Sequence, residues 1–408
     1  MNKILWVCHF LPYPSTGHGA LQRTHHLVRQ VAKSFDVHLF VVDEVEDHEA
    51  VSAALGVKSI SSIKPRTGLD KVLPMCRSLL GKSTYWERLF YHEALHAQIV
   101  SAAAVEPCLV ILDTAFLAPY VKHVNCQTLI VNHHNVESAL LAQRASRQGG
   151  ALTALFDAQA TRTAALEIEI SKLAAHHWVV SLEDSMRLRS VVGDVQTFIV
   201  PNGVDVEYFS PEPRATVSQI PNSLVFAGGM DWYPNRDAIK WLAEELWETL
   251  VNANPEHSMT IVGKSPPTEV LQLARTDARI EVAGFVPDVR PFIHRAFAYL
   301  CPIRQGGGTR LKVLDALALG CPLVATGLAV DGLQLKDEVH FLRADDGDSM
   351  ANALERLERE PELARELARN GRNHVIEHFS WDYIGSILVD FLSKSSSAER
   401  TARSKFSA

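Results

Sequence analysis

The glycine-rich turn Gly306-Gly307-Gly308 is the sharpest chemical signal in the sequence. It follows the apolar run Phe297–Leu300, which has the composition of a buried strand, and it precedes an amphipathic stretch. Glycines let backbone amides approach an anion, and the first amides of a helix lack intrahelical partners and lie at the positive end of its dipole. The order of strand, glycine turn and helix predicts a phosphate site over Gly306–Lys312, although glycine spacing alone also fits a simple tight turn.

Two cations accompany this turn, Arg310 and Lys312. Two residues apart on a helix, their side chains point to nearly opposite sides, so at most one of them is expected to reach the phosphates directly. We favour Arg310 for that contact.

The composition is that of a folded enzyme and excludes some classes. The 408 residues are 47% hydrophobic and 21% charged, with a net charge of −7. That length predicts two domains, and the acidic balance argues against a nucleic-acid-binding protein. No signal peptide or run of about 20 apolar residues is seen, and six scattered cysteines form no Cys-x-x-Cys pair, so we expect a cytoplasmic protein with reduced thiols.

Short apolar runs alternate with longer amphipathic stretches, as in parallel strands joined by helices. This pattern occurs twice, which predicts two doubly wound α/β domains. The strand-like runs are Ile4–Cys8, Val37–Val42, Leu109–Leu112, Thr128–Val131, Trp178–Val180 and Phe198–Val200, then Leu224–Ala227, Met259–Val262, Ile280–Val282, Phe297–Leu300, Leu323–Ala325 and His340–Leu342.

The prolines and turn formers of residues 201–222 predict the hinge between the domains. We expect an N-terminal domain over residues 1–200, a C-terminal domain over 201–380, and a final segment over 381–408 that contains an extra helix, Trp381–Leu392.

Five segments in order and spacing resemble the GT-B glycosyltransferases, in particular the retaining family 4 (glycosyl transferases group 1). The resemblance covers most of the chain to about residue 385. These segments are Asn132-His133-His134-Asn135-Val136-Glu137-Ser138, Val200-Pro201-Asn202-Gly203-Val204-Asp205, Phe226-Ala227-Gly228-Gly229-Met230-Asp231-Trp232-Tyr233-Pro234-Asn235, Gly284-Phe285-Val286-Pro287-Asp288-Val289 and Asp315-Ala316-Leu317-Ala318-Leu319-Gly320-Cys321-Pro322.

The resemblance implies two Rossmann-like domains that face a central cleft, with the donor held by the C-terminal domain and the acceptor by the N-terminal one. In such a site Asp315 holds the donor ribose, the amides of Leu311 and Lys312 hold the phosphates, and the base lies near Phe285. The implied donor-binding residues are Gly19, Gly229, Gly263, Phe285, Val286, Gly307, Gly308, Thr309, Arg310, Leu311, Lys312 and Asp315.

The sequence departs from the family pattern at three positions near the implied donor site. Gly307 stands where the family has a glutamate that contacts the donor sugar. Gly229 and Asn235 stand where many members have an arginine and a lysine for the diphosphate. We therefore expect the compensating charge to come from other cations, namely Arg304, Arg310, Lys312 or Lys264.

His134 matches the family histidine that hydrogen-bonds the donor sugar and supports positive charge at the anomeric carbon. The neighbouring His133 leaves this assignment ambiguous by one residue, and a satisfied loop histidine is the structural alternative. Three pairs of histidines occur in the sequence, and the two members of each pair are adjacent: His25-His26, His133-His134 and His176-His177. Adjacent histidines lack the i, i+4 spacing with which a helix binds a metal. The resemblance likewise implies no metal and no cofactor.

The stretch Lys64–Arg88 is locally basic, with six cations and two acids among apolar residues. Such a mixture suits contact with the anionic inner face of a membrane, or else a surface excursion whose apolar residues pack on the domain and whose charges are solvated.

Taken with the motifs, the resemblance implies transfer of a sugar from a nucleotide-diphosphate donor to the hydroxyl of a sugar or lipid-linked acceptor, with retention, in cell-surface polysaccharide or glycolipid assembly. The alternatives are a non-catalytic nucleotide-sugar-binding protein and a nucleotide-sugar epimerase of similar fold. No carboxylate pair spaced for glycoside hydrolysis and no dinucleotide fingerprint stands out.

Overall fold

The structure is a computed structural model that describes residues 3–14, 19–146, 150–211, 219–306 and 309–406. The chain divides into two compact units. One comprises Met1–Pro201 with Gly385–Ala408, and the other comprises Asn202–Ile384. We call them the N-terminal and C-terminal domains.

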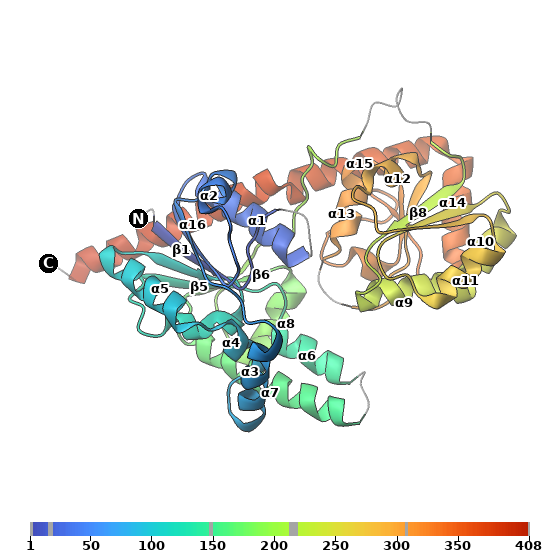
Figure 1. Cartoon of the computed structure of the whole chain (residues 1–408). Helices are drawn as coiled ribbons and strands as arrows, with labels where there is room; N and C mark the ends of the chain where they lie inside the picture. The colour runs from blue at the N-terminus through green and yellow to red at the C-terminus, as the bar shows by residue number, and fades with distance from the viewer. Residues whose placement is uncertain (1–2, 15–18, 147–149, 212–218, 307–308, 407–408) are drawn as a thin grey trace. The chain divides into compact units, whose positions relative to one another are not determined.

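The N-terminal domain is built on one parallel sheet of seven strands (Figure 1). Its strand order is β3-β2-β1-β4-β5-β6-β7. β1, β4 and β5 are buried along their whole lengths, as expected for strands covered by helices on both faces. The strands are β1 (Lys3–Cys8), β2 (Asp36–Val41), β3 (Ser59–Ser62), β4 (Leu109–Leu112), β5 (Thr128–Asn132), β6 (His176–Val179) and β7 (Thr197–Ile199).

Helices connect these strands. The α-helices are α1 (Gly19–Ala32), α2 (His48–Leu55), α3 (Val72–Leu80), α4 (Tyr85–Phe90), α5 (Glu93–Val105), α6 (Glu137–Ala145), α7 (Ala151–Ser171) and α8 (Leu182–Val192). Two 3₁₀ segments, η1 (Gly68–Lys71) and η2 (Ala115–Val121), complete the domain. α3, α4, α6 and α7 lie together and project from the sheet (Figure 1).

The C-terminal domain repeats this design with six parallel strands in the order β10-β9-β8-β11-β12-β13. They are β8 (Ser223–Ala227), β9 (Ser258–Val262), β10 (Ile280–Gly284), β11 (Ala298–Cys301), β12 (Leu323–Ala325) and β13 (Leu342–Arg343). The helical elements are α9 (Tyr233–Trp241), the π-helical turn η3 (Leu242–Leu246), α10 (Trp247–Ala253), α11 (Thr268–Thr276), α12 (Arg290–Arg295), α13 (Leu311–Ala318), the 3₁₀ turn η4 (Gly327–Val330), α14 (Gly347–Arg359) and α15 (Pro361–Phe379).

The prediction of two α/β domains with parallel sheets is confirmed. An apolar stripe follows β8, and its residues Ile239, Leu242, Leu246 and Leu250 are all fully buried. β3 was not predicted from the apolar runs, because three of its four residues are serines. Only Ile60 of this edge strand is buried.

The chain passes between the two units at residues 201/202 and 384/385. Close to these points Val204 forms a parallel bridge with Ser380, and its amide donates to the carbonyl of Phe379 at 2.8 Å. A Cβ at Gly203 would lie 2.7 Å from the Trp381 ring, so a glycine is required for this contact.

The last helix, α16 (Trp381–Phe406), includes the predicted segment Trp381–Leu392 and continues past it. From Gly385 onward it belongs to the N-terminal domain, where Phe391 stacks on Phe198 with ring centroids 4.2 Å apart. Within the described part of the chain, no helix combines the length and apolar character needed to span a bilayer.

Gly371 allows α15 to pack closely on α13. A Cβ there would lie 2.7 Å from Leu317 Cδ2 and 3.0 Å from the backbone oxygen of His340. We expect Gly371→Ala to lower the free energy of unfolding by about 1–3 kcal/mol, because overpacking outweighs the gain in helix propensity. Denaturant titration measures this, with the exposed Asn373→Ala on the same helix as a control that should be neutral or stabilising. Equal stability of the Gly371 variant and wild type would contradict the packing argument.

Candidate functional site

The strand orders define where each domain is able to bind a ligand. In each sheet the order reverses beside the first strand, between β1 and β4 in one domain and between β8 and β11 in the other. The loops that leave these neighbouring strands run to opposite sides and leave a crevice at the carboxyl edge. The predicted site residues fall into two clusters, one at each of these switch points.

In the C-terminal domain three glycines meet at the carboxyl ends of β8, β9 and β10. The amide of Gly228 donates to the carbonyl of Val262 at 2.8 Å, and that of Gly263 to the carbonyl of Gly284 at 2.7 Å. Gly263 has φ of +149°, and a Cβ there would overlap the Gly228 carbonyl oxygen. Side chains are thus excluded where the backbone lines the crevice.

Lys312 extends from the second position of α13 to this glycine turn. Its ammonium group donates to Asn235 Oδ1 and lies 4.5 Å from the centroid of the Phe226 ring. A Cβ at Gly228 would overlap the Lys312 Nζ, so the lysine occupies the space left by that glycine. Burial, reinforced by the Arg310 guanidinium, lowers the pKa of Lys312 to about 8.

Arg310 is buried and precedes the helix as the N-cap residue, with φ of −93° and ψ of 97°. The premise of the prediction for Arg310 and Lys312, that both are helical, is therefore wrong, because Arg310 precedes α13. The charges of Arg310 and Lys312 both lower the pKa of the nearby Cys301 thiol. Burial of this thiol has the larger, opposite effect, so its pKa is raised overall. Together the two cations concentrate positive charge at the start of α13.

Three further predicted donor residues, Thr309, Leu311 and Asp315, lie at or near this helix start, whereas Gly307 and Gly308 lie outside the described residues. The amide of Leu311 belongs to the first turn of α13, and Thr309 Oγ1 accepts from Asn202 Nδ2 at 2.8 Å. Asp315 lies one turn further along, and burial raises the pKa of its carboxyl to about 7 against the opposing effect of Lys312.

The predicted base-binding segment follows β10. Phe285 is 77% exposed and available to stack, whereas Val286 is half-buried against the domain core. Gly284 has φ of +70°, with no atom within 4 Å of an added Cβ. A glycine is therefore favoured at this position because the backbone is left-handed, and not because a neighbouring atom lies too close for a side chain.

Two other candidate cations are placed differently. Arg304 lies over the Trp241 ring at 4.4 Å and 3.6 Å from the Asp237 carboxylate, so it is engaged with α9. Lys264 is exposed and pairs with Asp231 at 3.0 Å. Its stem adjoins Gly229, where a Cβ would lie 3.4 Å from Lys264 Cε. Lys264 and Lys312 thus lie on either side of the Gly228-Gly229 turn.

In the N-terminal domain the switch point is occupied by a buried carboxylate, Asp113, directly after β4. It accepts from Thr24 Oγ1 at 2.7 Å, from Asn132 Nδ2 at 2.7 Å and from His134 Nε2 at 3.1 Å. Burial raises the pKa of Asp113, but the attraction of His134 and the hydrogen bonds from His134, Asn132 and Thr24 outweigh it, so the pKa is lowered overall. The carboxylate is held ionised.

This hydrogen bond places a proton on one nitrogen of the histidine ring. An ionised carboxylate only accepts hydrogen bonds, so His134 Nε2 carries a proton and donates it to Asp113. Nδ1 has no hydrogen-bond partner among the described residues. The neighbouring His133 instead bonds to His177 in the core, with Nε2 and Nδ1 3.0 Å apart, and burial lowers its pKa. The geometry therefore favours His134 over His133 as the site histidine.

Asp113 was missed by sequence reasoning, although a signal existed. It is the first residue after the apolar run Leu109–Leu112, at the carboxyl edge of the predicted sheet. The predicted Gly19 is the first residue of α1, which also supplies Arg23. The buried Arg23 guanidinium donates to Asn132 Oδ1 at 3.2 Å and to the Pro201 carbonyl at 2.9 Å.

Two further carboxyl groups, those of Glu137 and Glu167, lie close together at the end of the loop that carries His134. Glu167 of α7 is buried and accepts from Ser138 Oγ at 2.5 Å and from the Ser138 amide at 3.3 Å. The Glu137 amide also donates to this carboxylate. Glu167 therefore caps α6 and fixes the end of the loop. Burial, assisted by Glu167, raises the pKa of the Glu137 carboxyl to about 8.

No group of three or more His, Cys, Asp or Glu side chains with metal-binding geometry occurs in the part of the chain described by the structure. The polar chemistry of the two clusters consists of amides, two lysines, an arginine, a buried carboxylate and an imidazole. The amides and cations of the C-terminal cluster are suited to bind and stabilise an anion, and the carboxylate and imidazole of the N-terminal cluster are suited to orient a hydroxyl group.

Known proteins resemble this chain in sequence and in fold. Residues 221–360 match the family model described as glycosyl transferases group 1. A D-inositol 3-phosphate glycosyltransferase from Salinispora tropica is 28% identical over 150 residues, which are 35% of this chain and 31% of that protein. The chain thus matches less than a third of the length of this curated relative.

Two solved structures cover nearly the whole chain. A sucrose-phosphate synthase from Thermosynechococcus elongatus aligns over 98% of this chain and 100% of its own, with a TM-score of 0.69 and 18% identity. Anabaena HepE in complex with UDP and glucose aligns over 97% of this chain and 100% of its own, with a TM-score of 0.66 and 12% identity. These likenesses identify the fold as GT-B.

The pH dependence of stability tests the environment of Glu137. Its folded-state pKa is raised to about 8, so its contribution is full below the unfolded pKa and is lost as pH rises through about 8. Glu137→Gln removes this ionisation. We expect its melting temperature to fall less than that of wild type between about pH 5 and 9.

The exposed Glu49→Gln, in the first turn of α2, is the matched control and should retain the wild-type slope. If Glu137→Gln also retains that slope, the carboxyl group is not held protonated in the folded state.

Proposed function

We propose that this chain, which belongs to the group 1 glycosyl transferases through residues 221–360 and has the GT-B fold, transfers a sugar from a nucleotide-diphosphate donor to an acceptor hydroxyl. The C-terminal domain would bind the donor and the N-terminal domain the acceptor. The observation that carries the proposal is the cation-lined glycine turn at the switch point of the C-terminal sheet.

The donor diphosphate would lie at the start of α13. The Leu311 amide and the helix dipole favour an anion there, and Lys312 adds a full charge that Asn235 orients. This arrangement bears on two of the departures from the family pattern, those at Gly229 and Asn235. At the position of the usual lysine, Asn235 accepts from the ammonium group of Lys312, so a lysine from α13 would supply the positive charge there. Lys264 adjoins Gly229, where the usual arginine is absent.

The nucleoside would extend from this anion site along the Asp315 carboxyl group and a backbone edge. Asp315 would accept from the ribose hydroxyls, and the base would lie against Gly284–Val286, with the exposed Phe285 ring beside it. Bound UDP and glucose in the HepE structure support a uridine nucleotide as the first donor to test.

The chemistry follows from where charge develops. As the glycosidic bond breaks, negative charge accumulates on the departing diphosphate, and the α13 amides, Arg310 and Lys312 would stabilise it. Positive charge develops at the anomeric carbon, where the imidazole of His134 would assist. The buried Asp113 would act through His134 by holding its ring and tautomer. We propose retention of configuration, with the departing diphosphate accepting the proton of the acceptor hydroxyl.

The acceptor would be a sugar or a lipid-linked sugar in cell-surface polysaccharide or glycolipid assembly. We propose that the enzyme is a metal-independent hexosyltransferase that works in the cytoplasm.

A thermal-shift panel of UDP-, GDP- and ADP-sugars tests the donor site. At about 100 times its dissociation constant, a donor should stabilise the protein by ~2.7 kcal/mol, and one base should clearly exceed the others. Absence of a shift with every nucleotide sugar would refute the donor site. A shift without transfer to any acceptor would indicate a non-catalytic binding protein.

Two substitutions separate binding from chemistry. Lys312→Met should weaken nucleotide binding by roughly 10- to 100-fold, the loss expected for one charge-assisted hydrogen bond. His134→Ala should leave nucleotide binding unchanged and lower kcat by roughly a hundredfold or more, as for a group that stabilises developing charge. Calorimetry and single-turnover assays measure the two effects.

The titration of Lys312 gives this test a further readout. Because the pKa of Lys312 is about 8, wild-type affinity for the diphosphate should decline above about pH 8, and Lys312→Met should abolish that decline. The exposed Lys58→Met and His378→Asn serve as controls and should match wild type throughout. Unchanged turnover in His134→Ala would remove this residue from the site.

A further inference from the structure

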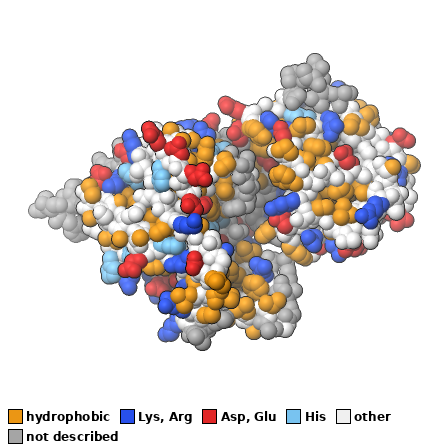
Figure 2. Space-filling model, viewed as in Figure 1, with side chains coloured by type: hydrophobic (Ala, Val, Ile, Leu, Met, Phe, Trp, Pro, Cys, Tyr) orange, Lys and Arg blue, Asp and Glu red, His pale blue; other side chains and the backbone are white. Residues whose placement is uncertain are grey.

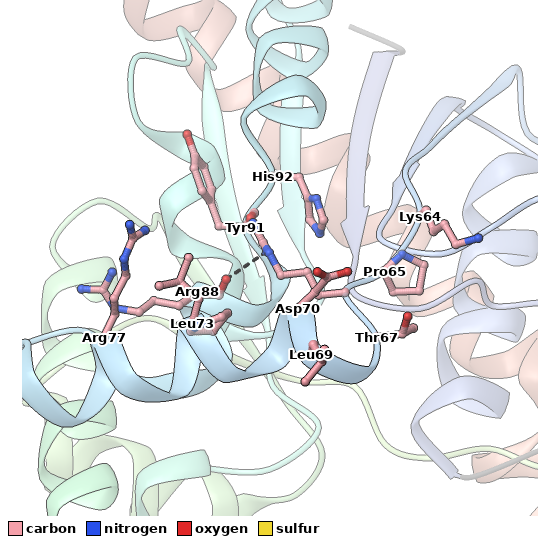
Figure 3. A pocket seen from close by; sticks show the side chains of 12 residues that line it. Lys64, Pro65, Thr67, Leu69, Asp70, Leu73, Arg77, Arg88, Tyr91 and His92 are labelled. Atoms are coloured by element: carbon pink, nitrogen blue, oxygen red, sulfur yellow. Dashed lines mark hydrogen bonds between the residues drawn. The ribbon is translucent and has the colours of Figure 1, made fainter.

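The segment between β3 and α5 forms an open groove outside both clusters described above. η1 and α3 form one wall, and the chain around Lys64 and His92 forms the other (Figure 3). The groove has a volume of about 570 Å³. Its lining includes the cations Lys64, Arg66, Arg77 and Arg88 and a single acid, Asp70.

One side of η1 and α3 presents large apolar side chains to solvent. Leu69 is 87% exposed, Leu73 54%, Met75 50% and Val72 46%. Four such residues within seven positions form a contiguous apolar surface, which soluble proteins usually cover or use for binding. The prediction that these apolar residues pack on the domain is therefore wrong for this part of the segment. We call this surface the α3 face.

Positive charge surrounds the α3 face. Lys64, Lys71, Arg77 and Lys82 are exposed, and so is one acid, Asp70. Lys64 pairs with the Glu44 carboxylate at 3.3 Å, so Lys71, Arg77 and Lys82 supply most of the excess positive charge. Of the two acids in the segment, Glu87 is directed inward, because its carboxylate accepts from the Thr84 amide in the capping box of α4. The surface is thus cationic on a chain whose net charge is −7. Figure 2 shows Lys and Arg side chains among hydrophobic ones on the part of the N-terminal domain where Figure 1 places α3.

The segment that presents this face is firmly held. Arg66 Nη1 donates to the carbonyls of Arg88, Leu89 and Tyr91 at 2.7–3.0 Å, which ties η1 to the end of α4. Arg162 of α7 donates to the Ser78 carbonyl at 2.6 Å. The buried face of α3 is therefore fixed by polar contacts, and the apolar face is left outward.

We propose that the α3 face binds the surface of an anionic lipid bilayer. Lys64, Lys71, Arg77 and Lys82 would contact lipid phosphates, while Leu69 and Leu73 would enter the boundary between headgroups and acyl chains. Cations beside exposed apolar side chains are the arrangement expected of a peripheral membrane contact. A stable protein interface usually needs about 800 Å² on each partner, which is large for one short helix and a turn.

This inference deepens the proposed function, because binding of an anionic bilayer would bring the enzyme to lipid-linked acceptors. It does not depend on catalysis, and it can be tested without donor or acceptor. If no nucleotide sugar stabilises the protein, the vesicle result is unaffected. If the protein does not bind vesicles, the thermal-shift result for the donor is unaffected.

Vesicle flotation of the full chain tests the proposal. Wild type should float with phosphatidylcholine vesicles that contain phosphatidylglycerol and not with phosphatidylcholine alone, and added salt should release it. Lys71→Glu combined with Leu73→Ser should weaken partitioning by about tenfold or more, since each basic residue near an anionic surface contributes roughly fivefold. Both side chains are exposed, so the fold should be retained.

The control combines Lys172→Glu with Leu173→Ser, the same changes at exposed neighbours at the end of α7. It should float like wild type, and melting temperatures of both variants should equal that of wild type.

Equal binding to neutral vesicles, or equal loss of binding in both variants, would overturn the proposal. So would displacement by inorganic phosphate at constant ionic strength, which would indicate a phosphate pocket. A change in oligomeric state in the α3 variant without a change in flotation would assign the face to a second copy of the chain.

Discussion

The reversal of strand order beside the first strand of each sheet determines where this protein is able to do chemistry. All strands within a sheet are parallel and mostly buried, so backbone polar groups become available to a ligand at the carboxyl edge. At the reversal the connecting loops diverge and leave that edge open. One such edge holds Gly228, Gly263 and the start of α13, and the other holds Asp113 and His134.

Charge at both edges is compensated by specific contacts. Asp113 is fully buried, and three donors with the nearby His134 ring keep it ionised. Lys312 and Asp315 lie one helical turn apart, and burial shifts the pKa of each toward neutrality, to about 8 and about 7. A bound diphosphate would favour the charged form of the lysine, so binding and protonation at this site are linked.

Much of the fold and part of the site could be predicted from the sequence. Apolar runs located nearly all strands, because buried parallel strands are continuously apolar, whereas the serine-rich β3 lies at an edge and lacks that signal. A helix after the glycine turn was predictable, but its first residue, Leu311, was not. The sequence placed Arg310 inside the helix, whereas it is the N-cap residue. The direction of its side chain therefore depends on the exact residue at which the helix begins, which the sequence does not define.

Contacts between distant positions could not be predicted in this way. The bond between Lys312 and Asn235 joins residues 77 positions apart, and Glu167 lies in the middle of a long helix with no local sign that it caps α6. Asp113 was accessible to sequence reasoning, since an acid directly after a buried strand is unusual, but its importance emerges only when Thr24, Asn132 and His134 converge on it.

The space above Gly228 has a consequence for how such sequences change. A Cβ at residue 228 would lie 2.4 Å from the Lys312 ammonium nitrogen, so a side chain there would displace that group from its present position. In this arrangement the glycine and the lysine form one unit although 84 positions separate 228 from 312 in the chain. Asn235 belongs to the same unit, because it holds that ammonium group. Among descendants of a common ancestor these three positions should vary together, and a lineage that restores a lysine at position 235 is thereby freed to lose the one at 312.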